Sequence, residues 1–365
     1  MPNKLDKIKT KKDSKRSEID VSVDRDCLVI KLSGVLKIRT IDSILDKLSV
    51  LKKSISKKEI TLIIENMLLD ISDLYPVRLG GVMGLVCLCS ALVKNQIDEV
   101  FKPAKFFIRR PSHEQVLIFL VNLNFFTWMT EKAKLLGCED LVQSEYEKER
   151  QRERNLYNTN YKSDYDTHPV FWPMTQIPCK GKSIADQDFE NVAQHFLNRA
   201  RDCFEKLFSS SRLNFSDANI HDFWGANYEL YDNIFEHSKS SLGLVAIHAN
   251  SDYPIKGAIA CYYDIGIGFK ESANTTPGIE KKFETDLEAI KWALLDGHTS
   301  NPNRIRHDGH GLTIVQELVL NTGGILEIRS GKCLLQRKSK EPDWKAYIVP
   351  WFPGSQISFF VPCQR

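Results

Sequence analysis

The chain has 365 residues, of which 42% are hydrophobic and 27% are charged, with a formal net charge of +3. This composition suits two globular domains with sizeable cores and excludes an overall disordered chain. The small net charge excludes a nucleic-acid footprint over the whole surface.

Membrane insertion and a disulfide framework are also not expected. The longest uncharged stretches, 79–93 and 116–129, fall short of the ~18 residues that a spanning helix needs. The nine cysteines have no disulfide-framework spacing, which favours a reducing compartment. These features predict a soluble, cytoplasmic protein with no membrane partner.

Residues 1–20 are expected to be a flexible basic tail, because seven of the first 16 residues are Lys or Arg. The default interpretation is a solvated terminus that lacks the apolar core of a secretory signal. The alternative is an arm that binds RNA, DNA or an acidic partner.

Residues 21–140 alternate short apolar strands with amphipathic helices, which is typical of an α/β sheet. The strands are expected at 27–32, 60–64 and 105–108, and the helices at 40–51, 79–94 and 113–126. A charged and polar linker is expected over 141–180, and a second domain over 181–365. The helix expected at 186–208 opens this second domain or serves as the contact of a homodimer.

Three islands of the second domain carry candidate chemistry. The first is a helix on which Glu229, Asn233 and His237 lie along one stripe, with apolar residues between them. An Asn oxygen can ligate Mg²⁺, and a Glu one turn away can take a proton from a water or hydroxyl that attacks a phosphate. For this helix taken alone, an ordinary amphipathic helix with a polar surface is the favoured interpretation.

The second island is Asp264, which follows a strand expected at 258–263 and precedes Gly266 and Gly268. The glycines let the backbone turn closely against a flat ligand, and the carboxylate can accept a hydrogen bond from an exocyclic amine. A plain glycine loop is the structural alternative.

The third island is Gly309-His310-Gly311-Leu312, which opens a helix expected at 312–321. Backbone N–H groups at a helix N-terminus, left uncovered by glycine, suit the oxygens of a triphosphate.

In their order and content, Glu-Leu-x-x-Asn-x-x-x-His-Ser, Asp-x-Gly-x-Gly and Gly-x-Gly-Leu resemble the GHKL ATPase superfamily, whose ATP-binding unit is the Bergerat fold. This resemblance covers about 185–365 and implies an α/β sandwich that binds ATP with Mg²⁺. It makes Asn233 the Mg²⁺ ligand, Asp264 the acceptor of the adenine amine, and Ser355 the substitute for a Thr in the closing turn. The residues that it implies for nucleotide binding are Asn233, Asp264, Gly266, Gly268, Gly309, Gly311, Leu312 and Ser355.

The resemblance also implies an ATP lid over 269–308. Its cations Lys281, Lys282, Arg304 and Arg306 are candidates to neutralise phosphate charge. His310 departs from the family pattern, which has a bulky apolar residue between the glycines, and is interpreted as a solvent-facing side chain.

In the hydrolysing members of the family and in the anti-sigma-factor kinases, a Glu at the position of Glu229 acts as the general base. A Glu at this position disfavours a histidine kinase. A histidine kinase would also need a phosphoacceptor, and the nearest candidate, His113, is better explained as the start of a helix.

The N-terminal domain resembles STAS domains, on the pattern around 60–93 and the ending Asn124-Phe125-Phe126. Phosphorylatable STAS domains have Ser or Thr at the start of the helix where this chain has Gly80 and Gly81. The nearest hydroxyl is Ser72, so a phosphorylation switch is not expected.

The fold class expected is therefore α/β (α+β), a STAS-like domain followed by a GHKL domain. Three functions agree with it. The preferred one is a regulatory Mg·ATP hydrolase whose lid closure switches a STAS-like domain or a protein partner. The alternatives are a serine/threonine kinase of the partner-switching type and a non-catalytic, ATP-stabilised scaffold that binds protein or nucleic acid.

Overall fold

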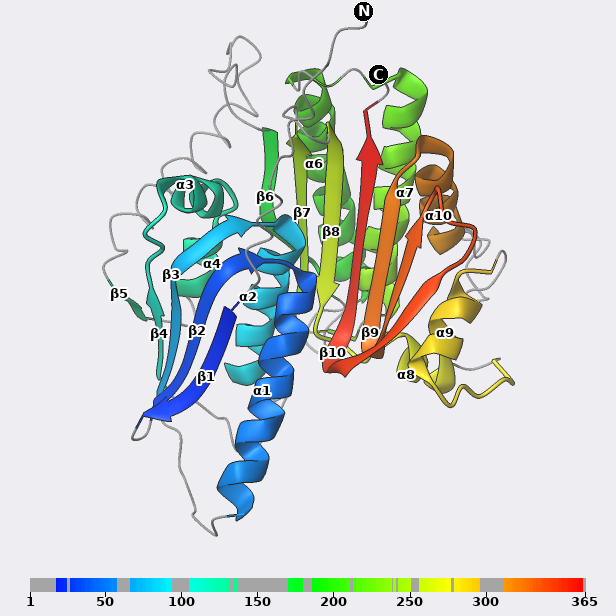
Figure 1. The fold of residues 1–365 in the computed structure, drawn as a ribbon. Helices are drawn as coiled ribbons and strands as arrows, with labels where there is room; N and C mark the ends of the chain where they lie inside the picture. Colours follow the sequence, from blue (N-terminus) through cyan, green and yellow to red (C-terminus); the bar gives the residue numbers. More distant parts are fainter. Residues whose placement is uncertain are drawn as a thin grey trace, which may run out of the picture.

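The structure is a computed structural model with two five-stranded sheets and helices packed on both of them, which confirms a mixed α/β protein (Figure 1). It describes residues 18–24, 27–57, 66–93, 105–130, 134–136, 170–179, 186–210, 213, 215–237, 239–240, 242–250, 256–276, 279–295 and 311–363.

The first sheet has the strand order β1-β2-β3-β4-β5, in which only the pair β1 and β2 is antiparallel. Its strands are β1 (Glu18–Asp24), β2 (Cys27–Leu36), β3 (Asn66–Val77), β4 (Lys105–Arg109) and β5 (Lys134–Leu136). Parallel neighbours need crossover connections, and α1 (Ile38–Lys57) lies between β2 and β3 in the chain and α2 (Leu79–Val93) between β3 and β4. We call this sheet with α1 to α4 the first unit.

Several elements of the first unit differ from expectation at their ends. The strand expected at 60–64 lies outside the described residues, and β3 follows it. The helix expected at 113–126 is two helices, α3 (Glu114–Asn122) and α4 (Phe125–Thr130). Asn124 has a φ of 58°, and this left-handed conformation ends the first helix. Residues 18–20, expected in the tail, are part of β1, and the tail before them lies outside the described residues.

The second sheet is antiparallel throughout and has the order β6-β7-β8-β10-β9. Its strands are β6 (Val170–Ile177), β7 (Gly243–Asn250), β8 (Gly257–Asp264), β9 (Ile325–Lys338) and β10 (Lys345–Pro362). The helices α6 (Asp186–Ser210), α7 (Asp217–His237) and α10 (Gly311–Thr322) share a hydrophobic core with one face of this sheet. The shorter helices α8 (Gly268–Thr275) and α9 (Asp286–Ala293) follow β8 in the chain. We call this sheet with α6 to α10 the second unit.

Strand β6 falls inside the stretch 141–180 that was expected to be a linker. Trp172 and Met174 are buried, and β6 pairs with β7 at the edge of the sheet. A shift of register between Trp172 and Thr175 brackets Pro173, which can occupy an edge strand because its missing N–H is not needed there. Residues 137–169 of the expected linker lie outside the described part of the chain.

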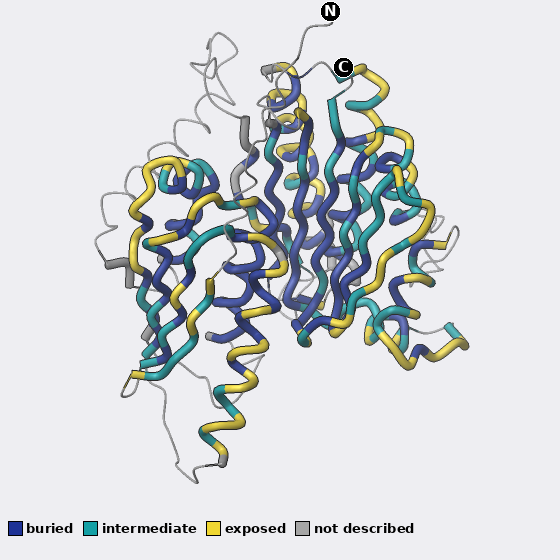
Figure 2. Tube along the Cα trace, in the orientation of Figure 1, coloured by how far each residue is buried: buried dark blue, intermediate teal, exposed yellow. Residues whose placement is uncertain are grey.

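Helix α2 lies between the two sheets (Figure 1). Each of its residues from Leu79 to Leu92 is buried, and a helix that is apolar all round is buried on all sides. Together with α1 it covers the second face of the second sheet, so that β7, β8 and the part of β10 after Trp351 are mostly buried (Figure 2).

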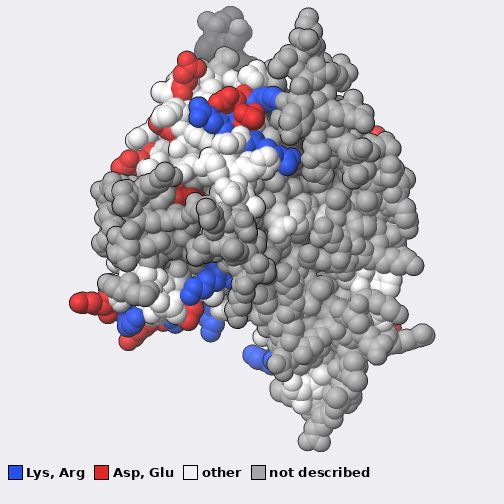
Figure 3. Space-filling model, turned by 180° about the vertical axis from the view of Figure 1, so that it is seen from behind, with Lys and Arg blue, Asp and Glu red and all other residues white. Residues whose placement is uncertain are grey.

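The described surface carries charges of both signs close together, as the rear view shows (Figure 3). Among the described residues, no helix is both long and apolar enough to cross a membrane.

Candidate functional site

Helices α7 and α10 bring the first and third islands together. A Cβ atom added to Gly311 would lie 2.9 Å from Glu229 Oε2 and 3.5 Å from Asn233 Nδ2. Leu312 is buried beneath this contact, in the core that α7 and α10 share. The glycine therefore opens α10 directly against a carboxylate and an amide, which are two groups that suit Mg²⁺-assisted phosphate chemistry. The side chain of His237, and all of Gly309 and His310, lie outside the described residues.

Asp264 ends β8 and is 2% exposed. Its Oδ1 accepts a hydrogen bond from the Gly266 N–H at 2.8 Å, and its Oδ2 accepts one from the Ser355 hydroxyl. Burial raises the pKa of Asp264 to about 6, and the hydrogen bonds from Ser355 and Gly266 oppose that rise. The Ser355 N–H also donates to this carboxyl group, so three of its about four acceptor positions are used within the protein and the rest is left for a ligand.

The backbone of this loop is fixed as firmly as the carboxylate. The Ile265 N–H is shared between Ser240 Oγ at 3.1 Å and the Leu242 carbonyl at 3.2 Å. Ser240 is buried, and its hydroxyl also donates to the Leu242 carbonyl at 2.7 Å. The sequence did not predict a role for Ser240. A serine in a short loop gives no indication that its hydroxyl binds an amide 25 residues away in the chain.

Gly354, from the turn before Ser355, closes the loop from the β10 side. It has a φ of 73°, and a Cβ there would overlap the Asp264 carbonyl and lie 2.6 Å from the Gly266 nitrogen. Gly268 has a φ of 72°, and its Cβ would lie 2.5 Å from Ser330 Oγ. Both positions require glycine. Gly266 has no positive φ, and its contribution is the amide that binds Asp264.

Ser330 connects this turn to the first helix of the expected lid, α8 (Gly268–Thr275). Its buried hydroxyl accepts from the Phe269 N–H at 3.0 Å and donates to the Gly354 carbonyl at 3.2 Å. Ser330 is a second residue that the sequence did not reveal, since it stands far from all three islands in the chain.

A buried hydrogen bond between Tyr262 and Asn227 connects β8 to α7. The Tyr262 hydroxyl donates to Asn227 Oδ1, and Asn227 Nδ2 donates to the Phe223 carbonyl. The ring of Tyr231 packs edge-on to Tyr262 at 5.4 Å between centroids. Asn227 precedes Glu229 by two residues and Tyr262 precedes Asp264 by two, so this pair aligns the helix and strand that carry the two candidate groups.

The described lid cations contact the lid itself. The Lys281 ammonium lies 5.2 Å from the centroid of the Phe283 ring, and Lys282 Nζ donates to the Asn274 carbonyl at 2.6 Å. The other two candidates, Arg304 and Arg306, lie outside the described residues. In this conformation neither described lysine is oriented by a partner in α7 or α10.

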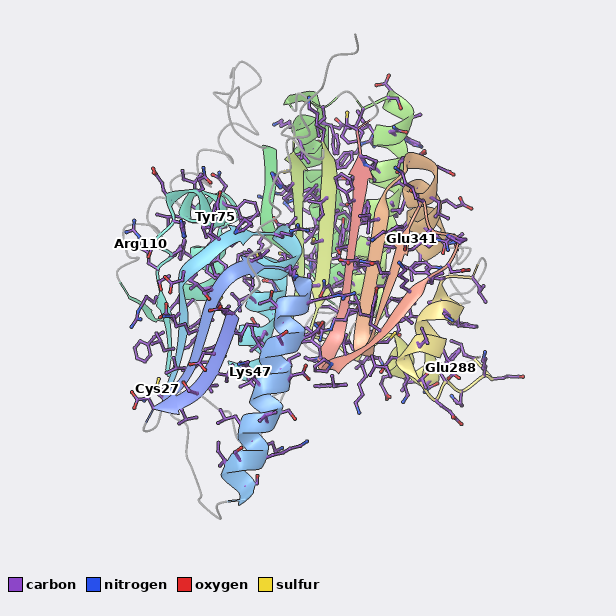
Figure 4. The ribbon with its side chains drawn as sticks, in the orientation of Figure 1. Cys27, Lys47, Tyr75, Arg110, Glu288 and Glu341 are labelled. Atoms are coloured by element: carbon purple, nitrogen blue, oxygen red, sulfur yellow. The ribbon has the colours of Figure 1, made fainter. Side chains whose placement is uncertain are left out.

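The last helix in the described part of the expected lid is α9 (Asp286–Ala293), which carries Glu288 in its first turn (Figure 4). A reciprocal capping box between Thr285 and Glu288 holds this turn. The Asp286 carboxylate accepts from the Lys332 N–H at 2.9 Å, which ties α9 to the bend of β9 at Gly331. The described part of the expected lid is thus joined to β9 at two places, through Ser330 at the start of α8 and through Asp286 at the start of α9.

His113 lies at the N-cap position of α3, as expected, and its ring stacks on Tyr75 at 5.0 Å. Ser72 lies within β3 and not at the start of α2, and its N–H donates to Asp70. Among the described residues, no group of three or more His, Cys, Asp or Glu gathers as a metal site. A metal held here would need Asn233 together with ligands from the bound phosphates.

Neither a scan against protein-family models nor a search of curated proteins gives a match to this chain.

Proposed function

We propose that this protein is a Mg·ATP-binding regulatory ATPase of the GHKL type, with a Bergerat-fold unit in its second half and a STAS-like unit in its first. The observation that carries the proposal is the contact of Gly311 with Glu229 and Asn233. This contact brings a carboxylate, an amide and a helix N-terminus from two separate islands to one place.

Recognition of the base is assigned to Asp264. A buried carboxylate that is already held by Ser355 and Gly266 keeps a fixed direction, and its remaining lone pair can accept the exocyclic amine of adenine. Guanine presents a carbonyl at that position and would face the carboxylate with a second acceptor. ATP is therefore favoured over GTP.

Phosphate binding is assigned to the start of α10, where Gly311 leaves the backbone open and the helix dipole favours an anion. Mg²⁺ would be held by Asn233 and by phosphate oxygens, and would supply charge neutralisation at the phosphates. Glu229 lies beside Gly311, where it can take the proton of the attacking water as that water's oxygen bonds to the γ-phosphorus and the bond to the β-phosphate breaks.

The same Glu229 could instead take the proton of a hydroxyl on a protein partner, and the phosphoryl group would then be transferred to Ser or Thr. Phosphate release and transfer of the γ-phosphoryl group to protein distinguish these two reactions. A scaffold that binds ATP without turning it over would show neither product.

The test of the reaction is the Glu229→Gln variant in the full chain. Gln keeps the size of the side chain but cannot take a proton, so we expect phosphate release to fall by about 100-fold or more while Mg·ATP affinity stays within a few-fold. Asn219→Asp in the same helix, near its start and away from Gly311, serves as a control. Equal phosphate release by Glu229→Gln and the unaltered protein would remove Glu229 from the mechanism.

A further inference from the structure

The face of the second sheet that points away from α7 and α10 is covered by the first unit. One hydrophobic cluster joins residues of α1 and α2 to residues of the second sheet, among them Leu244, Ala246, Cys261, Tyr263 and Phe352. The two units therefore share a core. A change of packing in α1 or α2 must be accommodated by β7, β8 or β10.

Tyr263 makes the first polar contact across this core. Its ring is 1% exposed, and its hydroxyl donates to the Gly80 carbonyl in the first turn of α2 at 2.6 Å. Gly84 makes room for it, because a Cβ there would lie 3.1 Å from the hydroxyl oxygen. The next residue along β8 is Asp264. Since successive side chains of a strand point to opposite faces, Tyr263 binds the first unit directly behind the adenine acceptor.

Arg329 makes the second contact. It is 1% exposed, and one of its terminal nitrogens lies 2.5 Å from Asp42 Oδ1 of α1 and donates to the Pro350 carbonyl at 3.1 Å. Its other two guanidinium nitrogens have no hydrogen-bond partner among the described residues. Asp42 is therefore the group that compensates this buried charge, and removing it leaves the guanidinium unpaired.

The residue after Arg329 is Ser330, which holds the Phe269 N–H at the start of the lid and the Gly354 carbonyl of the closing turn. The contacts of Tyr263 and Arg329 with α2 and α1 thus each lie one residue away from a part of the candidate nucleotide site. Tyr263 lies behind the adenine acceptor, and Arg329 lies behind the anchor of the lid.

We infer that the first unit regulates nucleotide affinity through Tyr263 and Arg329, which transmit the packing of α1 and α2 to the adenine loop and to the lid. The inference rests on the proposed function, because it names the regulation of the same site. Coupling of this kind is reciprocal. If packing of the first unit against the second sheet raises the affinity for Mg·ATP, then bound Mg·ATP must stabilise that packing by the same factor.

Two variants in the full chain test the coupling. Tyr263→Phe removes one oxygen on the side of β8 opposite the nucleotide, and Asp42→Asn removes the charge that faces Arg329. Each is expected to weaken Mg·ATP binding by roughly 10-fold in titrations of the folded protein. If Asp42→Asn does not fold, Tyr263→Phe carries the test, since it removes a single oxygen atom and leaves no buried charge.

Matched controls come from within the first unit. Tyr75→Phe removes a hydroxyl that donates to Gln115 at 3.0 Å, and Asp70→Asn removes a carboxylate that pairs with Arg109 at 2.7 Å. Tyr75 lies in β3 of the first unit (Figure 4), and it is not a member of the hydrophobic cluster that joins α1 and α2 to the second sheet. These controls change the same chemical groups, and we expect them to leave Mg·ATP affinity within two-fold of the unaltered protein.

Hydrogen exchange supplies a readout that loss of stability alone would not give. Mg·ATP should slow amide exchange in α2 of the unaltered protein, and this effect should shrink in Tyr263→Phe. Unchanged affinity in both interface variants, with α2 exchange indifferent to Mg·ATP, would overturn the inference. Failure of the proposed function is recognised separately, because the unaltered protein itself would then show no binding of Mg·ATP, and the inference would fall with it.

Discussion

Two apolar helices of this molecule begin at or beside glycine, and their glycines have different neighbours. In α2, a Cβ on Gly81 would lie 2.8 Å from backbone atoms of Leu36, and one on Gly84 would lie 2.9 Å from the Ile41 side chain. In α10, the neighbours of Gly311 are the Glu229 carboxylate and the Asn233 amide. Glycine near the helix start permits close packing on backbone and apolar atoms in the first case and close approach to polar side chains in the second.

The largest effect on stability is expected from Gly81→Ala. The atoms that its Cβ would meet belong to the backbone of Leu36 and Lys37, which cannot move aside without displacing the end of β2. We expect the free energy of unfolding to fall by about 2–3 kcal/mol, as for other overpacked core positions. Urea unfolding followed by circular dichroism measures it. An unchanged midpoint would mean that α2 is not packed as closely as the structure has it.

Gly311→Ala should have the opposite effect to Gly81→Ala, with a small change in stability and a large loss of phosphate release. The nearest atom to its Cβ is the end of the flexible Glu229 side chain, which can turn aside, so stability should change by less than about 1 kcal/mol. The turned carboxylate and the narrowed phosphate approach should lower phosphate release by about 10-fold or more.

Gly225→Ala is the matched control for Gly311→Ala. It lies on α7, and no atom would come within 4 Å of its Cβ. Alanine in an open helix position should raise the free energy of unfolding by about 0.5–1 kcal/mol and leave turnover unaltered. If both glycine variants lose turnover alike, the loss does not report a site at α10.

The pH dependence of stability gives a smaller and more specific effect. The pKa of Asp264 is about 6 in the folded protein and 3.8 for the free side chain, so the folded state favours its protonated form. Its contribution to stability is present below pH 4 and is lost as the pH rises through 6.

Asp264→Asn removes this contribution. Without nucleotide, the stability of the variant relative to the unaltered protein should therefore rise between pH 4 and pH 7, by about 2 kcal/mol. Asp42, whose pKa is also raised to about 6 by burial, is present in both proteins and cancels in the comparison. A difference that does not change with pH would show that the buried carboxyl is not titrating as described.

The sequence predicted the elements whose signal is local. The stretch 79–93 after β3 is uncharged and largely apolar, which predicted α2 to within one residue at its end, and the apolar run after Gly311 predicted α10. The pairing of Asp264 with Gly266 is also local. Its hydrogen bond to Ser355 is not, and placing both residues at one site depended on the resemblance to a known family.

Other features depend on contacts that no local pattern reveals. Nothing in the local sequence distinguishes Ser240 and Ser330 from other serines. Their hydroxyls bind the Ile265 and Phe269 N–H groups only because the fold brings these distant segments together. Pro173 favoured a linker over the strand β6, because a proline is compatible with a strand only where that strand is an edge. The covering of the second sheet by α1 and α2 follows from the packing of two units, which the alternation of elements within each unit does not determine.

The most direct test of the account is the melting temperature of the full chain with and without Mg·ATP, measured beside Asp264→Asn. A ligand that binds only the folded state at 100 times its Kd stabilises that state by about 2.7 kcal/mol, so the unaltered protein should melt several degrees higher with Mg·ATP. In Asp264→Asn the shift should disappear, because the single amide oxygen is occupied by Gly266 or Ser355 and the amide nitrogen faces the adenine amine with a second donor. No shift in the unaltered protein at millimolar Mg·ATP, or an equal shift in the variant, would contradict an adenine site at Asp264.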